Sequence, residues 1–343
     1  MFSFNFFSSP DSSSKCLANT QCVLLEDEII ICGGNDNKCY SFHTLRRTYK
    51  YICSYPSEVK LNGHCVLQWK HNESDSNETK LLSFGGQSKG EAKYTFMMRY
   101  KSVWSDGSKS QSEPHSSFNT WVRMPKFNIG SINDDFVGAR ALIGGANNNL
   151  LFITHSPGKI YVVDLNTMER YANITNATLP IEENMDDFRH HCFVPWTAKD
   201  ERVPNLFIFF CGKTGLLIKF DEANKDFKYE ALPTCLNLRD IVFDTYISDY
   251  DCIFFFARFK TVWKYSMQDR TWDKCNSTWS EMIKNPCAIL SKNNARVHIF
   301  GEADEIETPR KHIEINMSQL FEKHELLRML QKKKGSKRIT TKY

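Results

Sequence analysis

"IIICGGNDNKCYSF", residues 29 to 42, joins an apolar run to an aromatic-bearing run through two glycines and a short polar segment. Such a glycine pair can belong to a phosphate-binding loop or can end a β-strand. A phosphate-binding loop needs spaced glycines followed by a helix whose first amide groups face the anion. The next residues, up to "YKYICSYP", are rich in β-branched and aromatic side chains and lack helical spacing. The pattern therefore predicts two more strands and argues against nucleotide binding here.

The same arrangement recurs along the chain. "KLLSFGG" (80 to 86) repeats "EIIICGG" (28 to 34), and each is followed by a polar loop, an aromatic-bearing strand and a final strand that ends in proline. Four later units keep this order of strands but not the glycine pair. Their second strands lie in "NLLFITHSPG", "NLFIFFCGKTG", "CIFFFARF" and "RVHIFGE". An apolar run precedes each of them and supplies a first strand. Six units of four strands, with a period of roughly 45 to 60 residues, predict an all-β, six-bladed propeller of antiparallel strands.

A propeller has to close its ring, because open sheet edges would pair with other chains. The sixth unit lacks an evident fourth strand, whereas the N-terminus supplies "FSFNFFSSP". We therefore expect residues 2–10 to form the outer strand of the last blade, and residues 1–317 to form the propeller. After it, "SQLFEKHELLRMLQ" shows near-helical apolar spacing, so residues 318–343 are expected to form a short helix and a basic tail.

With its apolar run, glycine pair and following aromatics, the repeat resembles the kelch motif. The residues that carry the resemblance are Gly33, Gly34 and Tyr40 in the first unit, and Gly85, Gly86, Tyr94 and Trp121 in the second. We expect these seven residues to be structural, since a strand that turns at once beside packed neighbours needs a backbone without Cβ. In later units the pair is replaced, for example by His155 and Ser156, so the chain looks like a divergent member. The resemblance implies a protein-interaction scaffold, with actin or a ubiquitin-ligase component as the kind of partner.

Charge and targeting features narrow the choice of partner and compartment. The net charge is +4, and the tail "QKKKGSKRITTKY" alone carries more positive charge than that, so the remainder is not a basic nucleic-acid platform. The tail gives only a weak indication of RNA or acidic-lipid binding. No stretch approaches about 18 uninterrupted apolar residues, and the N-terminus lacks a basic segment typical of a signal peptide. A cytoplasmic location is expected, with the twelve scattered cysteines as reduced thiols.

No catalytic constellation, metal site or cofactor site is predicted. The adjacent pair His190 and His191 follows Asp186 and Asp187, but neighbouring side chains in a strand point to opposite faces and do not converge on one metal ion. The alternative is a copper oxidoreductase resembling galactose oxidase, which also uses a kelch-like propeller. That chemistry needs tyrosine and histidine ligands and a cysteine crosslinked to a tyrosine, and the sequence identifies no such set. The expected function is therefore a non-catalytic protein-binding scaffold.

Binding is expected on loops. In a propeller, the connections between second and third strands share one face with the connections between blades, and loops on a rigid scaffold commonly carry recognition. Basic side chains on these loops indicate an acidic partner. The predicted protein-binding residues are Asn35, Asp36, Lys38, Lys89, Lys93, Lys159, Lys213, Arg258 and Lys260.

Overall fold

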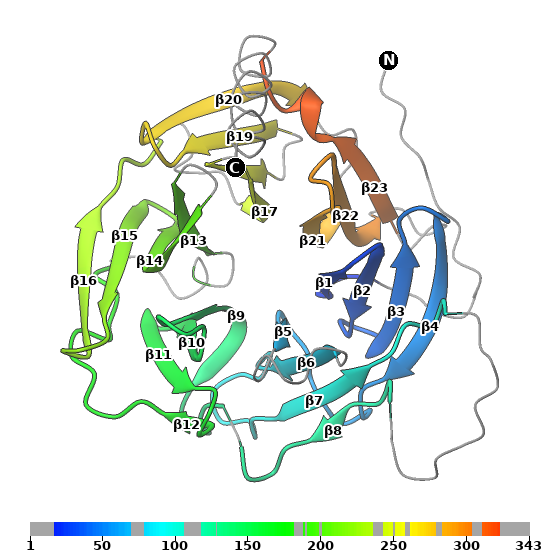
Figure 1. Cartoon of the computed structure of the whole chain (residues 1–343), viewed down its shortest axis with the longest axis horizontal. Helices are drawn as coiled ribbons and strands as arrows, with labels where there is room; N and C mark the ends of the chain where they lie inside the picture. The colour runs from blue at the N-terminus through cyan, green and yellow to red at the C-terminus, as the bar shows by residue number, and fades with distance from the viewer. Residues whose placement is uncertain are drawn as a thin grey trace, which may run out of the picture.

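Six antiparallel sheets are arranged as blades around a central axis (Figure 1). The computed structural model describes residues 17–69, 79–105, 118–127, 129–181, 188, 191–198, 201–235, 243–249, 251–257, 261–278, 283–303 and 311–322. The predicted six-bladed propeller is confirmed. Strands β1, β5, β9, β13, β17 and β21 lie innermost, and the later strands of each blade follow outward (Figure 1).

Each blade runs through consecutive strands, as the repeats predict. Blade 1 consists of β1 (Gln21–Leu25), β2 (Glu28–Cys32), β3 (Lys38–His43) and β4 (Thr48–Ser54). Blade 2 consists of β5 (Cys65–Trp69), β6 (Thr79–Phe84), β7 (Thr95–Tyr100) and β8 (Val122–Arg123). Blade 3 consists of β9 (Asp135–Gly144), β10 (Leu150–Ser156), β11 (Lys159–Asp164) and β12 (Glu169–Arg170).

The second half of the ring repeats this order. Blade 4 consists of β13 (Cys192–Ala198), β14 (Glu201–Cys211), β15 (Thr214–Asp221) and β16 (Asp226–Ala231). Blade 5 consists of β17 (Phe243–Asp249), β18 (Cys252–Ala257), β19 (Thr261–Ser266) and β20 (Thr271–Thr278). Among the described residues blade 6 has β21 (Ile283–Leu290), β22 (Arg296–Ala303) and β23 (Lys311–Asn316). The strand expected at residues 2–10 lies outside the described residues.

The second strand of each blade carries a central apolar run because both of its faces are covered by neighbouring blades. In β2, Ile29, Ile30 and Ile31 are fully buried, and alternate residues pack toward opposite neighbours. Ile30 belongs to a cluster shared with blade 2, whereas Ile29 and Ile31 belong to one that includes Phe300 of blade 6. Similar clusters lie between the other neighbouring blades. The ring is thus held together by apolar packing between sheets.

The glycine pairs let the turns after β2 and β6 lie against other backbone. Gly34 has φ +89°, and a Cβ there would lie 2.4 Å from the carbonyl oxygen of Ala18. Gly86 has φ +90°, and a Cβ there would lie 2.8 Å from the amide nitrogen of Asn62. These distances leave no room for a side chain, and positive φ disfavours one. The absence of a side chain at these glycines therefore lets each turn contact the segment that precedes an innermost strand.

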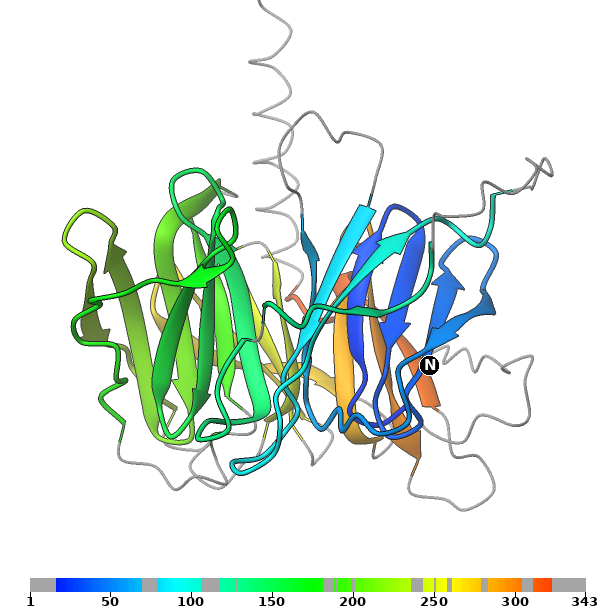
Figure 2. The same ribbon diagram turned by 90° about the horizontal axis from the view of Figure 1, so that it is seen from below.

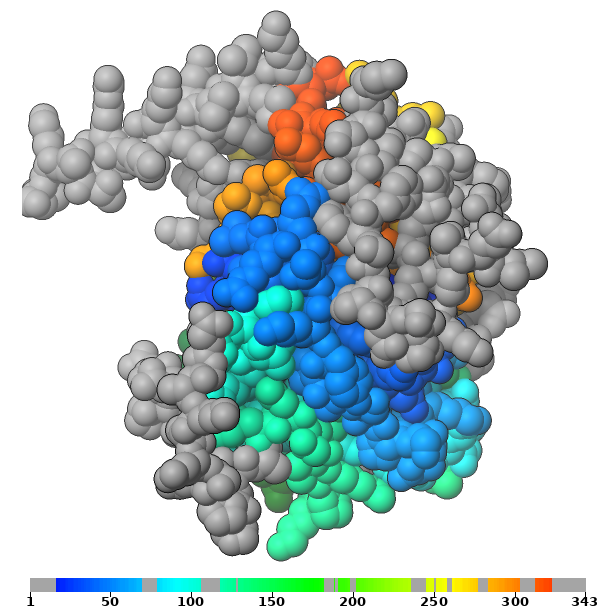
Figure 3. Space-filling model, turned by 90° about the vertical axis from the view of Figure 1, so that its right-hand side faces the viewer, coloured from blue at the N-terminus to red at the C-terminus, as the bar shows by residue number. Residues whose placement is uncertain are grey.

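Blades 1 and 6 meet through a set of polar contacts that we call the closure contacts. His312 Nδ1 lies 2.7 Å from the Tyr49 hydroxyl, and His312 Nε2 lies 2.9 Å from His298 Nδ1. Beside them, Arg47 donates to Glu314 over 2.9 Å, and Arg296 also pairs with Glu314. In the space-filling view, the blue surface of blade 1 lies next to the orange and red surface of blade 6 (Figure 3). The described strands thus contact each other where the ring closes.

The chain leaves β23 through a 3-10 helix, η4 (Met317–Gln319). Met317, Leu320 and Phe321 are buried in the cluster between blades 5 and 6, so the segment that follows β23 packs on the propeller. Description ends at residue 322, and the basic tail lies beyond it. Among the described residues, no helix has the length and hydrophobicity needed to cross a membrane.

Candidate functional site

The turns between second and third strands lie beside the segments that lead into the innermost strands. Asn37 Nδ2 donates to the carbonyl oxygens of Pro56 and Val59 over 3.2 and 3.0 Å. Gln87 Nε2 donates to the Lys60 carbonyl over 2.6 Å. These contacts put both sets of connections on one side of the ring, which we call the loop face. Figure 2 shows the ring from its side, with strands running from one face to the other.

The turn after β2 uses its polar side chains partly for its own structure. Asp36 Oδ1 accepts a hydrogen bond from the Lys38 amide over 3.2 Å, and Asn35 Oδ1 accepts one from Asn19 Nδ2 over 2.9 Å. Asn35 is exposed, whereas Asp36 and Lys38 are half-buried. The predicted binding residues of blade 1 therefore lie on the loop face as expected, and two of them also fix the turn.

Lys89 and Lys93, in the turn after β6, differ in exposure. Lys89 is exposed, but Lys93 is buried, and its Nζ donates to the carbonyls of Ser88 and Glu91 over 2.8 Å each. Burial lowers the pKa of Lys93, while nearby carboxylates act in the opposite direction. Glu91 in turn pairs with Lys60. Lys93 thus holds the turn together rather than extending toward a partner.

Two further predicted lysines are exposed on the next blades. Lys159 begins β11 directly after the turn that follows β10, and Lys213 lies in the turn between β14 and β15. Together with Lys89 they place one exposed ammonium group on each of three successive blades. We call Lys89, Lys159 and Lys213 the lysine arc. Arg258 and Lys260 fall outside the described residues.

The aromatic residues of the repeat lie within or between blades. Trp121 stacks on Tyr55 with ring centroids 4.7 Å apart, and its Nε1 donates to Cys39 Sγ over 3.2 Å. Tyr40 is buried, and Tyr94 stacks on Phe96 beneath the guanidinium of Arg123. These rings therefore contribute packing between strands and do not line the lysine arc.

Of the adjacent pair His190 and His191, only His191 is described, and it contacts other protein groups. His191 is buried, with Nε2 2.6 Å from Thr154 Oγ1 and Nδ1 2.6 Å from the Phe188 carbonyl. His190, Asp186 and Asp187 lie outside the described residues. In the part of the chain that the structure covers, no three histidine, cysteine or acidic side chains are placed to hold a metal ion.

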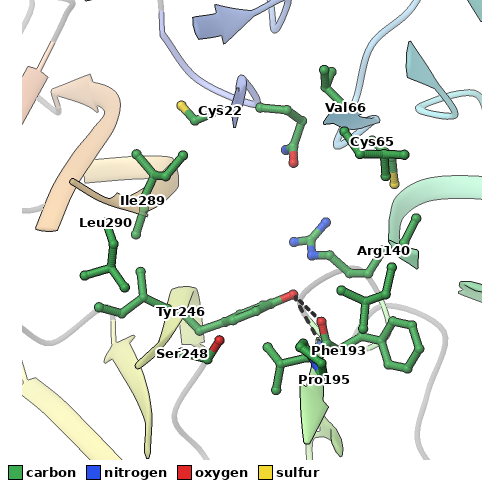
Figure 4. Close-up of a pocket in the computed structure, with 17 residues that line it drawn as sticks. Cys22, Cys65, Val66, Arg140, Phe193, Pro195, Tyr246, Ser248, Ile289 and Leu290 are labelled. Atoms are coloured by element: carbon green, nitrogen blue, oxygen red, sulfur yellow. Dashed lines mark hydrogen bonds between the residues drawn. The ribbon is translucent and has the colours of Figure 1, made fainter. Parts of the chain in front are cut away.

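A cavity of about 450 Å³ runs along the axis of the ring (Figure 4). Its wall takes residues from the innermost strand of every blade: Gln21, Cys22, Cys65, Val66, Leu67, Arg140, Ala141, Leu142, Phe193, Val194, Pro195, Tyr246, Ile247, Ser248, Ala288, Ile289 and Leu290. Most of these residues are apolar, but polar groups make up about half of the surface that lines the cavity, and Arg140 is the one charged residue among those described. We call this cavity the central channel.

A second hollow of about 320 Å³ lies at the lead-in segments of the innermost strands and shares Gln21 and Arg140 with the central channel. Its other lining residues include Asn19, Asn62 and Asn285. Because these segments belong to the loop face, Arg140 lies where the channel approaches that face. Arg140 was not among the predicted site residues, because a basic residue within an apolar strand gives no signal of which way its side chain points.

Comparison with known proteins identifies the fold alone. No family model and no curated protein matches the chain. A solved structure described as the structure of YjhT aligns with a TM-score of 0.58 at 10% identity, over 90% of this chain and 97% of that one. Saccharomyces cerevisiae Sqt1 and the computationally designed Ika8 protein align at TM-scores of 0.47 and 0.38 with 10% and 9% identity, over 84% and 90% of this chain and 69% and 74% of theirs.

Proposed function

We propose that this chain is a divergent kelch-type propeller that serves as a non-catalytic, cytoplasmic protein-interaction module, with the loop face as its binding surface. The observation that carries the proposal is the lysine arc, which sets exposed ammonium groups on three successive blades. The hydrogen bonds of Asn37 and Gln87 fix two turns of this face before any partner binds. Fixed turns reduce the entropy lost on association.

The partner that fits this surface is a protein with an acidic segment. Lys93 is buried in its turn and Lys60 pairs with Glu91, whereas Lys89, Lys159 and Lys213 are exposed, so we assign recognition of the partner to the lysine arc. Complementary charge raises the association rate and favours one partner over others more than it adds affinity. The kelch resemblance suggests actin or a ubiquitin-ligase component as the partner class.

The test replaces all three residues of the lysine arc by glutamate and measures partner recovery from the native cell by quantitative proteomics. We expect the main partner to be recovered at least about tenfold less, since opposing charges at a binding surface become repulsive. Binding by the unaltered protein should also weaken steeply as salt is added, because exposed charges are screened.

A matched control makes the same charge change away from the loop face. Lys101, Lys219 and Lys228 are exposed, and Lys219 and Lys228 are cross-strand neighbours on the outer part of blade 4. Their replacement by glutamate should leave partner recovery within about twofold of the unaltered protein. Equal losses in both triple variants, or no loss in the arc variant, would remove the loop face as the binding surface.

A further inference from the structure

The central channel contains one positive charge and no described acid to neutralise it. Arg140 comes from β9, and none of the residues that line the channel or the adjoining hollow is aspartate or glutamate. A guanidinium group in an apolar enclosure is costly unless an anion or polar groups compensate it. We propose that the central channel binds a small organic carboxylate, with Arg140 as the residue that pairs with its charge.

The side chain of Arg140 is held so that part of its guanidinium faces the cavity. Nη1 donates to the carbonyls of Gly138 and Ala139 over 3.2 and 3.1 Å, which anchors one side of the group. Figure 4 shows the guanidinium extending into the channel, with the Tyr246 hydroxyl close to it. The planar fork of donors matches a carboxylate in two parallel hydrogen bonds.

The charge of Arg140 reaches groups on four other blades. Burial raises the pKa of Cys65, Cys192 and Tyr246, and the charge of Arg140 acts on all three in the opposite direction. For Cys287 a hydrogen bond with Cys22 lowers the pKa against the effect of burial, and Arg140 acts in the same lowering direction. Cys65, Cys192, Tyr246 and Cys287 belong to blades 2, 4, 5 and 6. Arg140 is therefore close to the axis and half-buried, so solvent screens its charge less than that of a fully exposed side chain.

The uncharged residues that line the central channel indicate the chemistry of the rest of the ligand, beyond its carboxylate. Leu142, Val194, Ile247 and Ile289 offer apolar contact, while Gln21 and Ser248 provide neutral polar groups. The volume, about 450 Å³, lies within the usual range for small-molecule pockets. A single cation beside these apolar side chains suits a monoanion that carries a hydrocarbon or aromatic part better than a multiply charged phosphate.

The site is separate from the lysine arc, and its test does not depend on the proposed function. Isothermal titration of the full chain would compare benzoate with benzamide, its neutral counterpart, and with inorganic phosphate. We expect benzoate to bind in the millimolar range or tighter and benzamide at least about tenfold more weakly, because only benzoate pairs with a guanidinium. This comparison uses the unaltered protein and so does not rely on any variant being folded.

Two variants then locate the binding. Arg140→Gln should weaken benzoate binding at least about tenfold. Arg123→Gln removes the same charge from an exposed position on β8 and should leave benzoate affinity within about twofold. Equal binding of benzoate and benzamide, unchanged binding in Arg140→Gln, tighter binding of phosphate than of benzoate, or no benzoate binding at about 20 mM would each overturn the proposal.

Discussion

Gly34→Ala is expected to lower the free energy of unfolding by about 3 kcal/mol or more. The new methyl group would lie 2.4 Å from the Ala18 carbonyl oxygen and 2.9 Å from Thr20 Cγ2, so the turn and the segment before β1 would have to separate. That movement also strains the hydrogen bond from the Asn35 amide to the Ala18 carbonyl, which is 3.2 Å long. Crowding by backbone is expensive because backbone cannot change rotamer.

Gly90→Ala is the matched control for this prediction. Gly34 and Gly90 both have φ +89°, but a Cβ at Gly90 meets nothing within 4 Å. The control therefore carries only the cost of a side chain at positive φ, of about 1 kcal/mol. Urea titrations of the two variants would measure the difference. Equal destabilisation would mean that backbone conformation alone, and not close approach, explains the glycine after β2.

Much of the fold follows from local sequence pattern. In runs such as "EIIIC" the apolar residues are consecutive and do not alternate with polar ones. The reason is that such a strand is covered on both faces, so neither face is exposed to solvent. The glycine pairs mark the ends of β2 and β6 for the steric reason given above. Blade 3 departs from the repeat: its proline-ended segment "NATLP" (176–180) does not form the outer strand, because β12 is Glu169–Arg170 and Thr178 makes a single bridge to Lys159.

Features that depend on register or on distant contacts could not be predicted. Arg140 pairs with Thr154 at the last regular position before the register of β9 and β10 shifts, and nothing near it in sequence indicates that its side chain faces the axis. Lys93 was expected on the surface with Lys89, yet it is buried beside Asp134 and Asp135, which lie some forty positions later. Loop composition therefore predicted the face but not which of its lysines would be exposed.

Acid is expected to destabilise the propeller well before its carboxylates protonate. Burial lowers the pKa of His64 to about 3 and that of His155 to about 4, and burial together with Arg296 and Arg47 lowers the pKa of His298 to about 4. An unfolded histidine has a pKa near 6.5. Between these values the unfolded chain binds more protons than the folded one, so stability is complete above about pH 6.5 and is lost as the pH falls.

At pH 5 each of these histidines should cost about 2 kcal/mol of stability relative to pH 7, or about 6 kcal/mol for the three. Urea titrations at pH 7, 6 and 5 would measure the loss, and this window lies above the range in which most carboxylates titrate. His64→Met removes one titrating group and should reduce the loss by about 2 kcal/mol, whatever it costs at pH 7. An unchanged pH dependence in that variant would mean that His64 is not neutral in the folded protein. Because His298 belongs to the closure contacts, amide hydrogen exchange in β22 and β23 should rise with acid before exchange in β15, which holds none of these histidines and is remote from that boundary.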